Sequence, residues 1–392
     1  MVLEKELIIK GGTVIDPSQG LNGNFDIALS EGKISKVETS INEKGSQEVF
    51  DATGLIVVPG LIDLHIHAFW GGSTYGIDPD ISNLSRGVTT ALDAGSAGAW
   101  TFPSFRSHII DKSLTRIYAL LNMSTTGMVF RDEGELKDLK WADLDHTVEE
   151  GLANKDRILG IKARLGRVQS GVNDMEALKI SIEAATLIGG FVMIHIGNSN
   201  TPLPELIDML RPGDVITHSF HGFGDGTLES SGYVLQSMKD AQSRGVVIDV
   251  GHGAGGFSFA AAERAMSEGL IPNTISTDLH INNFTGPVFD LVTTMSKFMH
   301  LGMSLNDAIA RCTEFPAKIM GLGNVGNLKV GAEGDLAILK LEEGKFTLRD
   351  RLSTATSLGP NTWAPGMSVT ATSRLAHLLT VKAGAIYKPW LP

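Results

Sequence analysis

The chain has 392 residues, of which 42% are hydrophobic, and this is enough to bury a large core. Its 33 basic and 44 acidic residues give a formal net charge of −11 without long acidic runs, which argues against binding nucleic acid through a basic face. The single cysteine, Cys312, excludes an intrachain disulfide and a cysteine-rich zinc site, and it fits the cytoplasmic location that we predict. The N-terminus does not read as a signal peptide, and no apolar stretch reaches the ~18 residues of a membrane span, so no membrane partner is predicted.

Both ends of the chain read as short β-strands. Residues 1–57 contain the β-rich runs "ELIIKGGTVIDP", "FDIALSEGKISKVE" and "SQEVFDATGLIVVP", separated by turn residues, and "SEGK" predicts a hairpin. Similar text returns from about Asn324, in "GNLKVGAEGDLAILKLEEGKFTLRD". We therefore predict a small β-sandwich domain that is built from residues 1–57 and 323–392.

Between these ends, apolar runs alternate with amphipathic segments. The runs are "GLIDLHIH", "GVTTALDAG", "TRIYALLNMS", "RILGIKARLG", "GFVMIHIGN", "DVITHSFHG", "GVVIDVGHG" and "NTISTDLH". Helices are predicted for "DMEALKISIEAATLIGG" and "FAAAERAMSEGL". Continuous apolar runs are typical of parallel strands that are buried on both faces. The fold class predicted for residues 58–322 is therefore α/β, a (β/α)8 TIM barrel.

Two histidines lie near the end of the first of these runs, in "PGLIDLHIHAF". Side chains alternate across a strand, so His65 and His67 point to the same side. They fall at the C-terminal end of the strand, where barrels of this kind place their active sites. The H-x-H pattern alone leaves open whether the pair binds a metal or is simply packed in the core.

Further ligand-type residues occur at other strand ends: Lys162 on the fourth strand, His195 on the fifth, His218 on the sixth and Asp278 on the eighth. A buried lysine amine is costly unless it is paired or neutral, and a neutral amine can capture CO2 to form a carbamate that bridges two cations. Taken singly, each histidine could be a satisfied core residue, and Lys162 could pair with Asp63 or Asp278. Six ligand types at five strand ends favour a two-metal site.

These motifs together resemble the amidohydrolase superfamily. "VVPGLIDLHIHAF" is similar to its first barrel strand, and the β-rich ends are similar to its flanking domain. In its binuclear, dihydroorotase-like members, the H-x-H pair and the strand-eight aspartate bind one metal. Histidines on strands five and six bind the other metal, and a carboxylated lysine bridges the two. The resemblance implies these roles for His65, His67, Asp278, His195, His218 and Lys162.

The stretches "LGIKARLGR", "MIHIGN", "THSFHG" and "VIDVGHG" are similar to a branch labelled dihydroorotase, D-aminoacylase or deacetylase. This implies a hydrolase that removes an acyl group, such as acetyl, from an N-acyl amino acid or an O-acyl 2-hydroxy acid. Two divalent cations, with zinc favoured by the imidazole and carboxylate ligands, would generate the attacking metal-bound hydroxide. Asp278 would act first as the general base and then as the general acid. A small carboxylate is the predicted partner, and a homo-oligomer is left open.

Four residues are candidates for binding the substrate: Arg164, His252, Tyr75 and Asn283. Arg164 has the same strand phase as Lys162, so it either binds a substrate carboxylate or pairs with Asp93 or another acid of the barrel. The bulky and polar loop residues Trp70, His221 and His280 either line the site and orient its ligands or are ordinary loop residues.

Two other functions remain open. Ring opening of dihydroorotate fits less well, because the "HxHxR" arginine is missing and Ala68 and Phe69 follow His67 instead. An inactive, amidohydrolase-like binding or assembly protein is a hypothesis of another class, but such a protein would have no need for the complete set of ligand types.

Overall fold

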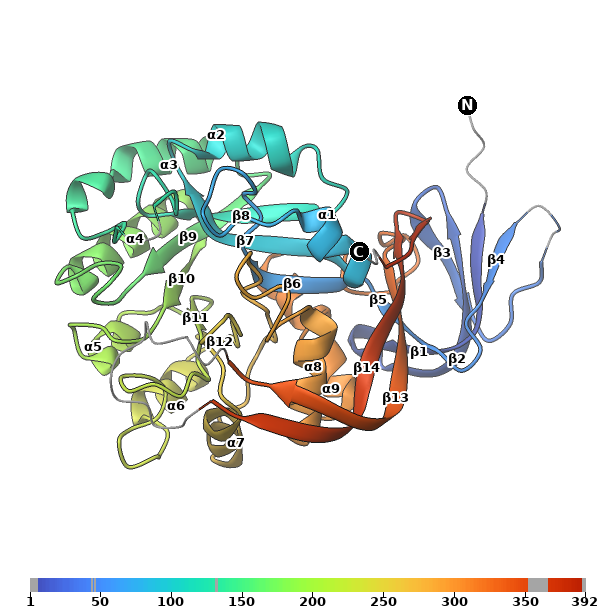
Figure 1. Cartoon of the computed structure of the whole chain (residues 1–392). Helices are drawn as coiled ribbons and strands as arrows, with labels where there is room; N and C mark the ends of the chain where they lie inside the picture. The colour runs from blue at the N-terminus through green and yellow to red at the C-terminus, as the bar shows by residue number, and fades with distance from the viewer. Residues whose placement is uncertain (1–5, 44, 46, 131–132, 352–365, 390–392) are drawn as a thin grey trace.

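The computed structural model describes residues 6–43, 45, 47–130, 133–351 and 366–389. The predicted β regions at the two ends therefore include residues 1–5, 44, 46, 352–365 and 390–392, which lie outside the described part. Two sheets organise the rest, and Figure 1 shows them side by side, with helices α2 to α8 around the parallel one.

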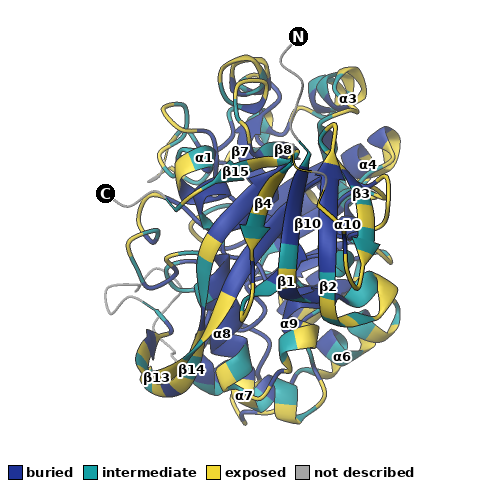
Figure 2. Cartoon of the chain, turned by 90° about the vertical axis from the view of Figure 1, so that its right-hand side faces the viewer, coloured by how far each residue is buried: buried dark blue, intermediate teal, exposed yellow. Residues whose placement is uncertain are grey.

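The central sheet is parallel and has the strand order β12-β11-β10-β9-β8-β7-β6, which is the order of the chain. Its strands are β6 (Leu61–Ile66), β7 (Val88–Gly98), β8 (Arg116–Asn122), β9 (Ile158–Arg164), β10 (Phe191–His195), β11 (Val215–Thr217) and β12 (Val247–Ile248). Every residue of β6 and β7 is buried, as expected for strands that are covered on both faces. Figure 2 shows buried strands at the centre of the molecule and partly exposed helices at its periphery. The curled parallel sheet confirms the α/β class and seven of the eight predicted strands.

Helices follow most of these strands. They are α1 (Pro79–Ser82), α2 (Phe102–Phe105), α3 (Leu144–Ala153), α4 (Asp174–Ile188), α5 (Leu203–Asp208), α6 (Gln236–Ser243), α7 (Phe259–Ser267), α8 (Leu291–His300), α9 (Leu305–Ala310) and α10 (Glu314–Ile319). The predicted helices at 174 and 259 are confirmed; Gly189 ends α4 in the left-handed conformation that glycine allows. Among the described helices, none has the length and apolarity needed to cross a membrane.

The prediction of a regular eighth strand is wrong. Residues 274–279 make only two isolated parallel bridges, Asp249 with Thr274 and Ile66 with Leu279, one to each end of the curled sheet. Side chains replace the regular ladder, because the Asp63 carboxylate accepts hydrogen bonds from both the backbone N–H (3.0 Å) and the hydroxyl of Thr277. Asp278 then has a φ of 46°, which ends the extended conformation. The segment still brings Asp278 to the mouth of the sheet.

The second sheet is mixed and is built from both chain ends, as predicted. Its strands are β1 (Leu7–Asp16), β2 (Leu21–Ser30), β3 (Lys33–Glu38), β4 (Glu48–Asp51), β5 (Ile56–Pro59), β13 (Leu336–Arg349), β14 (Ser368–Lys382) and β15 (Ala385–Tyr387). They form one hydrogen-bonded path, β15-β14-β13-β5-β1-β2-β3, with β4 paired to β1, so the prediction of a two-sheet sandwich is corrected to one continuous sheet. The "SEGK" hairpin is confirmed, with Glu31 and Gly32 at positive φ.

One buried carboxylate, Asp335, connects the two sheets. It accepts hydrogen bonds at 2.8 Å from Arg116 at the start of β8 and at 2.8 Å from Lys382 at the end of β14. Burial alone would raise the pKa of Asp335, but Lys382 and Arg116 together lower it. The carboxylate is therefore charged in the folded protein and neutralised by a cation from each sheet.

We expect Asp335→Asn to lower the free energy of unfolding by ~3–5 kcal/mol, because it leaves Lys382 as a buried and unpaired cation. Urea titration of the variant and the wild type measures the difference. Asp138→Asn is the control, since Asp138 pairs with Lys140 in an exposed position and should change stability far less than Asp335→Asn does. Equal destabilisation by the two variants would contradict the proposed connection.

Candidate metal centre

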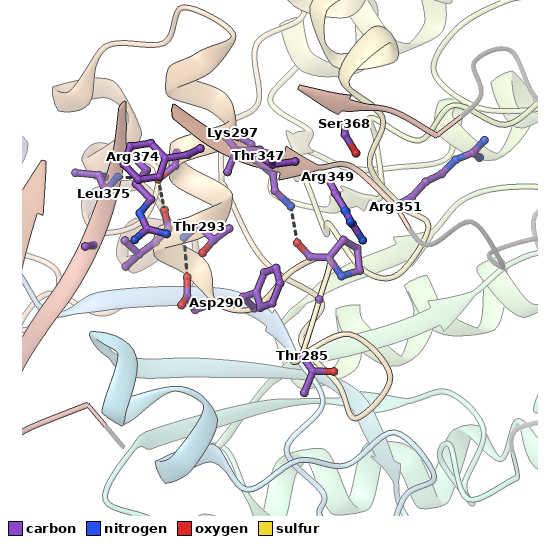
Figure 3. Close-up of a pocket in the computed structure, with 18 of the residues that line it drawn as sticks. Thr285, Asp290, Thr293, Lys297, Thr347, Arg349, Arg351, Ser368, Arg374 and Leu375 are labelled. Carbon is purple, nitrogen blue, oxygen red and sulfur yellow. Dashed lines mark hydrogen bonds between the residues drawn. The ribbon is translucent and has the colours of Figure 1, made fainter. Parts of the chain in front are cut away.

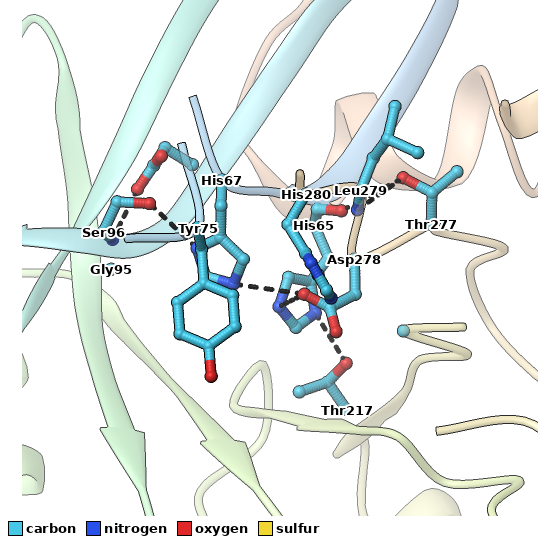
Figure 4. A network of polar contacts seen from close by, with 12 residues as sticks. His65, His67, Tyr75, Gly95, Ser96, Thr217, Thr277, Asp278, Leu279 and His280 are labelled. Atoms are coloured by element: carbon cyan, nitrogen blue, oxygen red, sulfur yellow. Dashed lines mark hydrogen bonds and ion pairs between the residues drawn. The ribbon is translucent and has the colours of Figure 1, made fainter. Parts of the chain in front are cut away.

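Three predicted ligands, His65, His67 and Asp278, converge at the C-terminal end of β6. Their ligand atoms all lie within 4.8 Å of one another, and Figure 4 shows Asp278 between the two imidazoles. Oδ1 of Asp278 lies 3.3 Å from Nε2 of His65 and 3.1 Å from Nε2 of His67. Two imidazole nitrogens and one carboxylate oxygen that face a common point form a group that can hold a divalent cation.

The hydrogen bonds of two histidines fix their protonated nitrogens. The Thr217 hydroxyl donates to Asp249 at 2.7 Å, so its oxygen accepts the 2.9 Å hydrogen bond from Nδ1 of His65. Nδ1 of His218 lies 2.6 Å from the carbonyl oxygen of Gly251, which can only accept. Each ring therefore carries its proton on Nδ1, and its Nε2 lone pair is available to a metal.

A third histidine is oriented from the neighbouring strand β7. Nδ1 of His67 lies 2.8 Å from the hydroxyl of Ser96. Asp93 holds this region in place, because its carboxylate accepts hydrogen bonds at 2.7 Å from the backbone N–H groups of both Ser96 and Ala68. The Asp93 carboxylate therefore holds the two backbone segments that lie beside His67.

The second half of the predicted ligand set lies next to the first. The His218 ring is 4.5 Å from the His195 ring and 5.1 Å from the His65 ring, centroid to centroid. The stem of Lys162 passes Gly95 so closely that a Cβ on Gly95 would lie 2.5 Å from the lysine Cβ. Lys162 is 1% exposed, and no described residue hydrogen-bonds to its Nζ or to Nε2 of His195. Two buried polar nitrogens therefore have no described protein partner.

Burial also sets the charges of these groups. It lowers the pKa of His67 and of His218 to about 3, and the pKa of His65 and of His195 well below the usual value. The four imidazoles are therefore neutral at pH 7, as metal ligands must be. Burial likewise lowers the pKa of Lys162 to about 7, so a substantial fraction of its amine is neutral and nucleophilic.

Arg164 lies on β9, two residues after Lys162, and has an acidic neighbour. Its Nη1 lies 3.2 Å from the Glu135 carboxylate, and its guanidinium lies 5.8 Å from the ring centroid of Tyr75. The alternative prediction was an ion pair with Asp93 or another acid of the barrel, and the acid observed beside Arg164 is Glu135. The Tyr75 ring in turn lies 5.8 Å from that of His67 and 5.2 Å from that of His280. Tyr75 therefore stands between Arg164 and the histidines.

The other substrate candidates have local partners. His252 is buried and contacts Lys297 and Gly253. Asn283 donates to the carbonyl oxygen of Asp278 at 2.8 Å and accepts from the N–H of His280 at 2.9 Å, so its amide braces the loop. A contact of Tyr75, Asn283 or His252 with substrate stays a prediction.

Among the loop residues with two interpretations, Trp70 is 59% exposed. His221 and His280 are buried, and each accepts a backbone N–H at Nδ1 from the residue two positions later.

The supporting residues Ser96, Thr217, Asp249 and Glu135 were not found from the sequence. Ser96 and Thr217 are ordinary hydroxyl residues inside apolar runs, and the spacing of the ligands gives no signal for them. Asp249, in "VVIDVGHG", was a detectable signal, because a carboxylate in a fully buried strand requires partners. It has three of them, the hydroxyls of Thr217, Thr274 and Ser276.

Comparison with known proteins gives the family. Residues 256–372 match the model of the Amidohydrolase family. A deacetylase from Brucella anthropi is 36% identical over 321 residues, which cover 82% of this chain and 80% of that protein. The chain belongs to the amidohydrolase family. A second relative, a deacetylase from Enterococcus faecalis, is 31% identical over 98% of this chain and 100% of its own length. A crystal structure described as a dihydroorotase matches with a TM-score of 0.87 at 29% identity, over 98% of this chain and 97% of that one. The resemblance inferred from the motifs is confirmed.

The lowered pKa of His218 predicts a pH-dependent stability of the metal-free protein. The pKa of His218 is about 3 in the folded protein and near 6.5 in the unfolded chain. Between these pH values the unfolded chain binds a proton on His218 and the folded chain does not. The contribution of His218 is therefore fully present above pH 6.5 and is lost as the pH falls toward 3. In His218→Asn, whose amide can still donate to Gly251, the unfolding free energy should fall less between pH 6.5 and 4.5.

Urea titrations in the presence of a chelator measure this slope. His146→Asn is the control, because the His146 side chain is 40% exposed, and it should keep the wild-type slope. A His218→Asn slope equal to that of the wild type would show that His218 is not held neutral by the fold.

Proposed function

We propose that this amidohydrolase is a binuclear metal-dependent hydrolase that removes an acyl group, such as acetyl, from a small 2-substituted carboxylate. The observation that carries the proposal is the pair of buried nitrogens without a described hydrogen-bond partner, Nζ of Lys162 and Nε2 of His195, beside the group His65, His67 and Asp278. Buried polar atoms without partners cost free energy, so a ligand that binds them accounts for their presence. The bridges of residues 274–279 to both ends of the curled sheet support a closed (β/α)8 barrel around this site.

The residues fit two cations. His65, His67 and Asp278 would hold one cation, His195 and His218 would hold the other, and Lys162 would bridge them as its carbamate. The neutral fraction of the Lys162 amine supports the carbamate, because only the free amine reacts with CO2. Four imidazoles and two oxygen ligands favour zinc over magnesium or calcium.

When bound, the cations supply a water of lowered pKa and polarise the substrate carbonyl. Asp278 is the residue of this chain that is placed to move the proton. Its carboxylate lies against both H-x-H imidazoles and is 13% exposed, so one edge of it faces the mouth of the barrel. It would take a proton from the water and deliver it to the leaving oxygen or nitrogen. The brace from Asn283 to the Asp278 carbonyl holds the carboxylate at a fixed place.

The carboxylate substrate is supported by Arg164. Its guanidinium has five N–H donors, and the contact with Glu135 does not occupy all of them. A substrate carboxylate bound there would lie next to Tyr75, on the side of the cations where Tyr75 contacts His67. Two relatives at 36% and 31% identity are named deacetylases, which supports acetyl as the group removed.

Ring opening of a cyclic amide is the second candidate, because one of the similar solved structures is described as a dihydroorotase. The residues after the H-x-H pair do not favour it. Ala68 is buried and its N–H is bound to Asp93, and the Phe69 ring packs 4.9 Å from that of Phe105. Neither Ala68 nor Phe69 supplies a charged group for the substrate. The third hypothesis, an inactive binding protein, gives no reason for neutral histidines around a buried lysine.

We expect Lys162→Ala to lose most of its zinc and its activity, because the bridge between the two ligand groups is removed. Short carboxylic acids such as propionate should restore part of both, since a carboxylate fills the space of the carbamate. Metal content is measured by elemental analysis after reconstitution with zinc and bicarbonate. A Lys162→Ala protein with normal zinc content and a normal rate would rule out the bridge.

A substrate panel tests the function itself. The panel contains N-acetyl-D- and L-amino acids, O-acetyl 2-hydroxy acids, their neutral methyl esters, and cyclic imides. We expect hydrolysis of an acetylated carboxylate. In the double variant Arg164→Met with Glu135→Gln, kcat/KM should fall by ~10–100-fold, because a charge-assisted hydrogen bond to the substrate is lost. The second substitution avoids leaving the Glu135 carboxylate buried without a cation. For the neutral methyl esters, kcat/KM should fall little in this variant.

Arg167→Met is the control for the panel, because Arg167 is the exposed arginine three residues later. Turnover of cyclic imides alone would favour the ring-opening function. Equal losses for acids and neutral esters would show that Arg164 does not bind the carboxylate.

A further inference from the structure

The segment Gly251–Gly253, which follows β12, touches two of the proposed metal ligands. The carbonyl oxygen of Gly251 accepts the 2.6 Å hydrogen bond from Nδ1 of His218. On the other side, the Cα of Gly253 lies so close to Asp278 that an added Cβ would be 2.5 Å from its Oδ2. The position of this short segment therefore sets the orientation of His218 and limits the position of Asp278.

Both glycines are required by the backbone. Gly251 has a φ of 48° and Gly253 a φ of 55°, and a Cβ on Gly251 would lie 2.1 Å from the hydroxyl of Thr217. Two backbone hydrogen bonds join this segment to the irregular eighth segment. The N–H of His252 donates to the carbonyl oxygen of Ser276 at 3.1 Å, and the N–H of Gly253 donates to that of Thr277 at 2.9 Å. Because the two flanking residues are glycines, His252 is the residue of this segment whose side chain can anchor it.

The His252 side chain is fully buried, and both of its ring nitrogens have hydrogen-bond partners. Its ring stacks on Phe257 at a centroid distance of 4.8 Å. Nδ1 lies 2.9 Å from the carbonyl oxygen of Gly253 and must donate to it. Burial lowers the pKa of His252 well below its usual value, so the ring is neutral and Nε2 can only accept. The donor at Nε2 is Nζ of Lys297, at 2.7 Å.

Lys297 comes from helix α8 and is also fully buried. Besides His252, its amine donates to the carbonyl oxygen of Pro287 at 2.8 Å, in the loop that follows Asp278, and Figure 3 shows this bond. The same close-up shows Lys297 in the wall of a cavity of about 1110 Å³, between α8 and the hairpin β13–β14. A lysine amine donates hydrogen bonds in both its charged and its neutral form, so the contact does not depend on its protonation.

We propose that Lys297 is a positioning residue of the metal centre, which acts through His252 to hold the Gly251–Gly253 segment against His218 and Asp278. The inference rests on the proposed binuclear function. Lys297 connects three parts of the fold, namely α8, the segment after β12 and the loop after Asp278, at one buried amine. Without this donor, Nε2 of His252 would be a buried acceptor with no partner, and the ring would turn or admit water. The carbonyl of Gly251 would then be held less tightly relative to His218, by the hydrogen bonds to the eighth segment alone.

Zinc binding by the intact protein tests this role without any substrate. Competition with a chromophoric chelator gives the two zinc affinities of the wild type and of Lys297→Met. We expect the affinity of the weaker site to fall by ~10–100-fold, as is typical when a residue that orients a metal ligand is lost. Ser296→Ala is the matched control on the same helix, because Ser296 accepts a hydrogen bond from Leu375 of β14 and does not contact His252. It should keep both affinities.

A double variant shows whether Lys297 acts through His252. His252→Leu should lower zinc affinity by itself, and adding Lys297→Met to it should cause little further loss. Losses that multiply in the double variant, or a folded Lys297→Met protein with wild-type zinc affinities, would overturn the proposal. A wild-type protein that binds fewer than two zinc ions would contradict the proposed function as well.

The cavity allows a second test if Lys297→Met does not fold. Lys297→Ala would extend the cavity toward His252, and propylamine added during refolding can replace the missing amine. Zinc affinity that rises with propylamine concentration in Lys297→Ala, and not in the wild type, supports the proposal. An affinity that does not respond to the amine counts against it.

Discussion

The energetic constraint that dominates this structure is the burial of the Lys162 amine without a hydrogen-bond partner among the described residues. A buried ammonium is costly, and burial moves its pKa to about 7. The surrounding imidazoles cannot compensate for a positive charge, because they are neutral themselves. A ligand that enters the site and binds these groups would remove this cost. We propose that cations held by His65, His67, His195, His218 and Asp278, together with a carbamate on Lys162, would satisfy all of these groups.

Around these ligands, short hydrogen bonds convert flexible side chains into a rigid site. Thr217 and Asp249 fix His65, Ser96 contacts His67, and the Gly251 carbonyl fixes His218. Most of these partners come from strands of the sheet or directly follow them, so the precision of the site derives from the central sheet. Since the sheet is parallel and curled, all its C-terminal ends open at one edge, and the proposed ligands from five segments far apart in the sequence meet there.

The sequence predicted the parallel sheet, the shared sheet of the two chain ends and the convergence of the H-x-H pair with Asp278, because these follow from side-chain periodicity and from strand ends. It did not predict that the eighth segment is irregular. That depends on Asp63, whose carboxylate replaces the regular ladder in a long-range contact with Thr277 that periodicity does not encode. The partner of Arg164 was left open for the same reason, since Glu135 belongs to a loop whose path the local sequence does not specify. The Lys297–His252 contact joins a helix to a turn and likewise has no sequence pattern.

The proposed function requires that the six ligand residues hold two cations. Its most direct test is the zinc content of the purified protein after removal of bound metal and reconstitution with zinc and bicarbonate, measured by elemental analysis against protein concentration. We expect about two zinc ions per chain, bound tightly enough to survive gel filtration. A content of one zinc or less per chain, in protein that is fully folded, would contradict the proposed function.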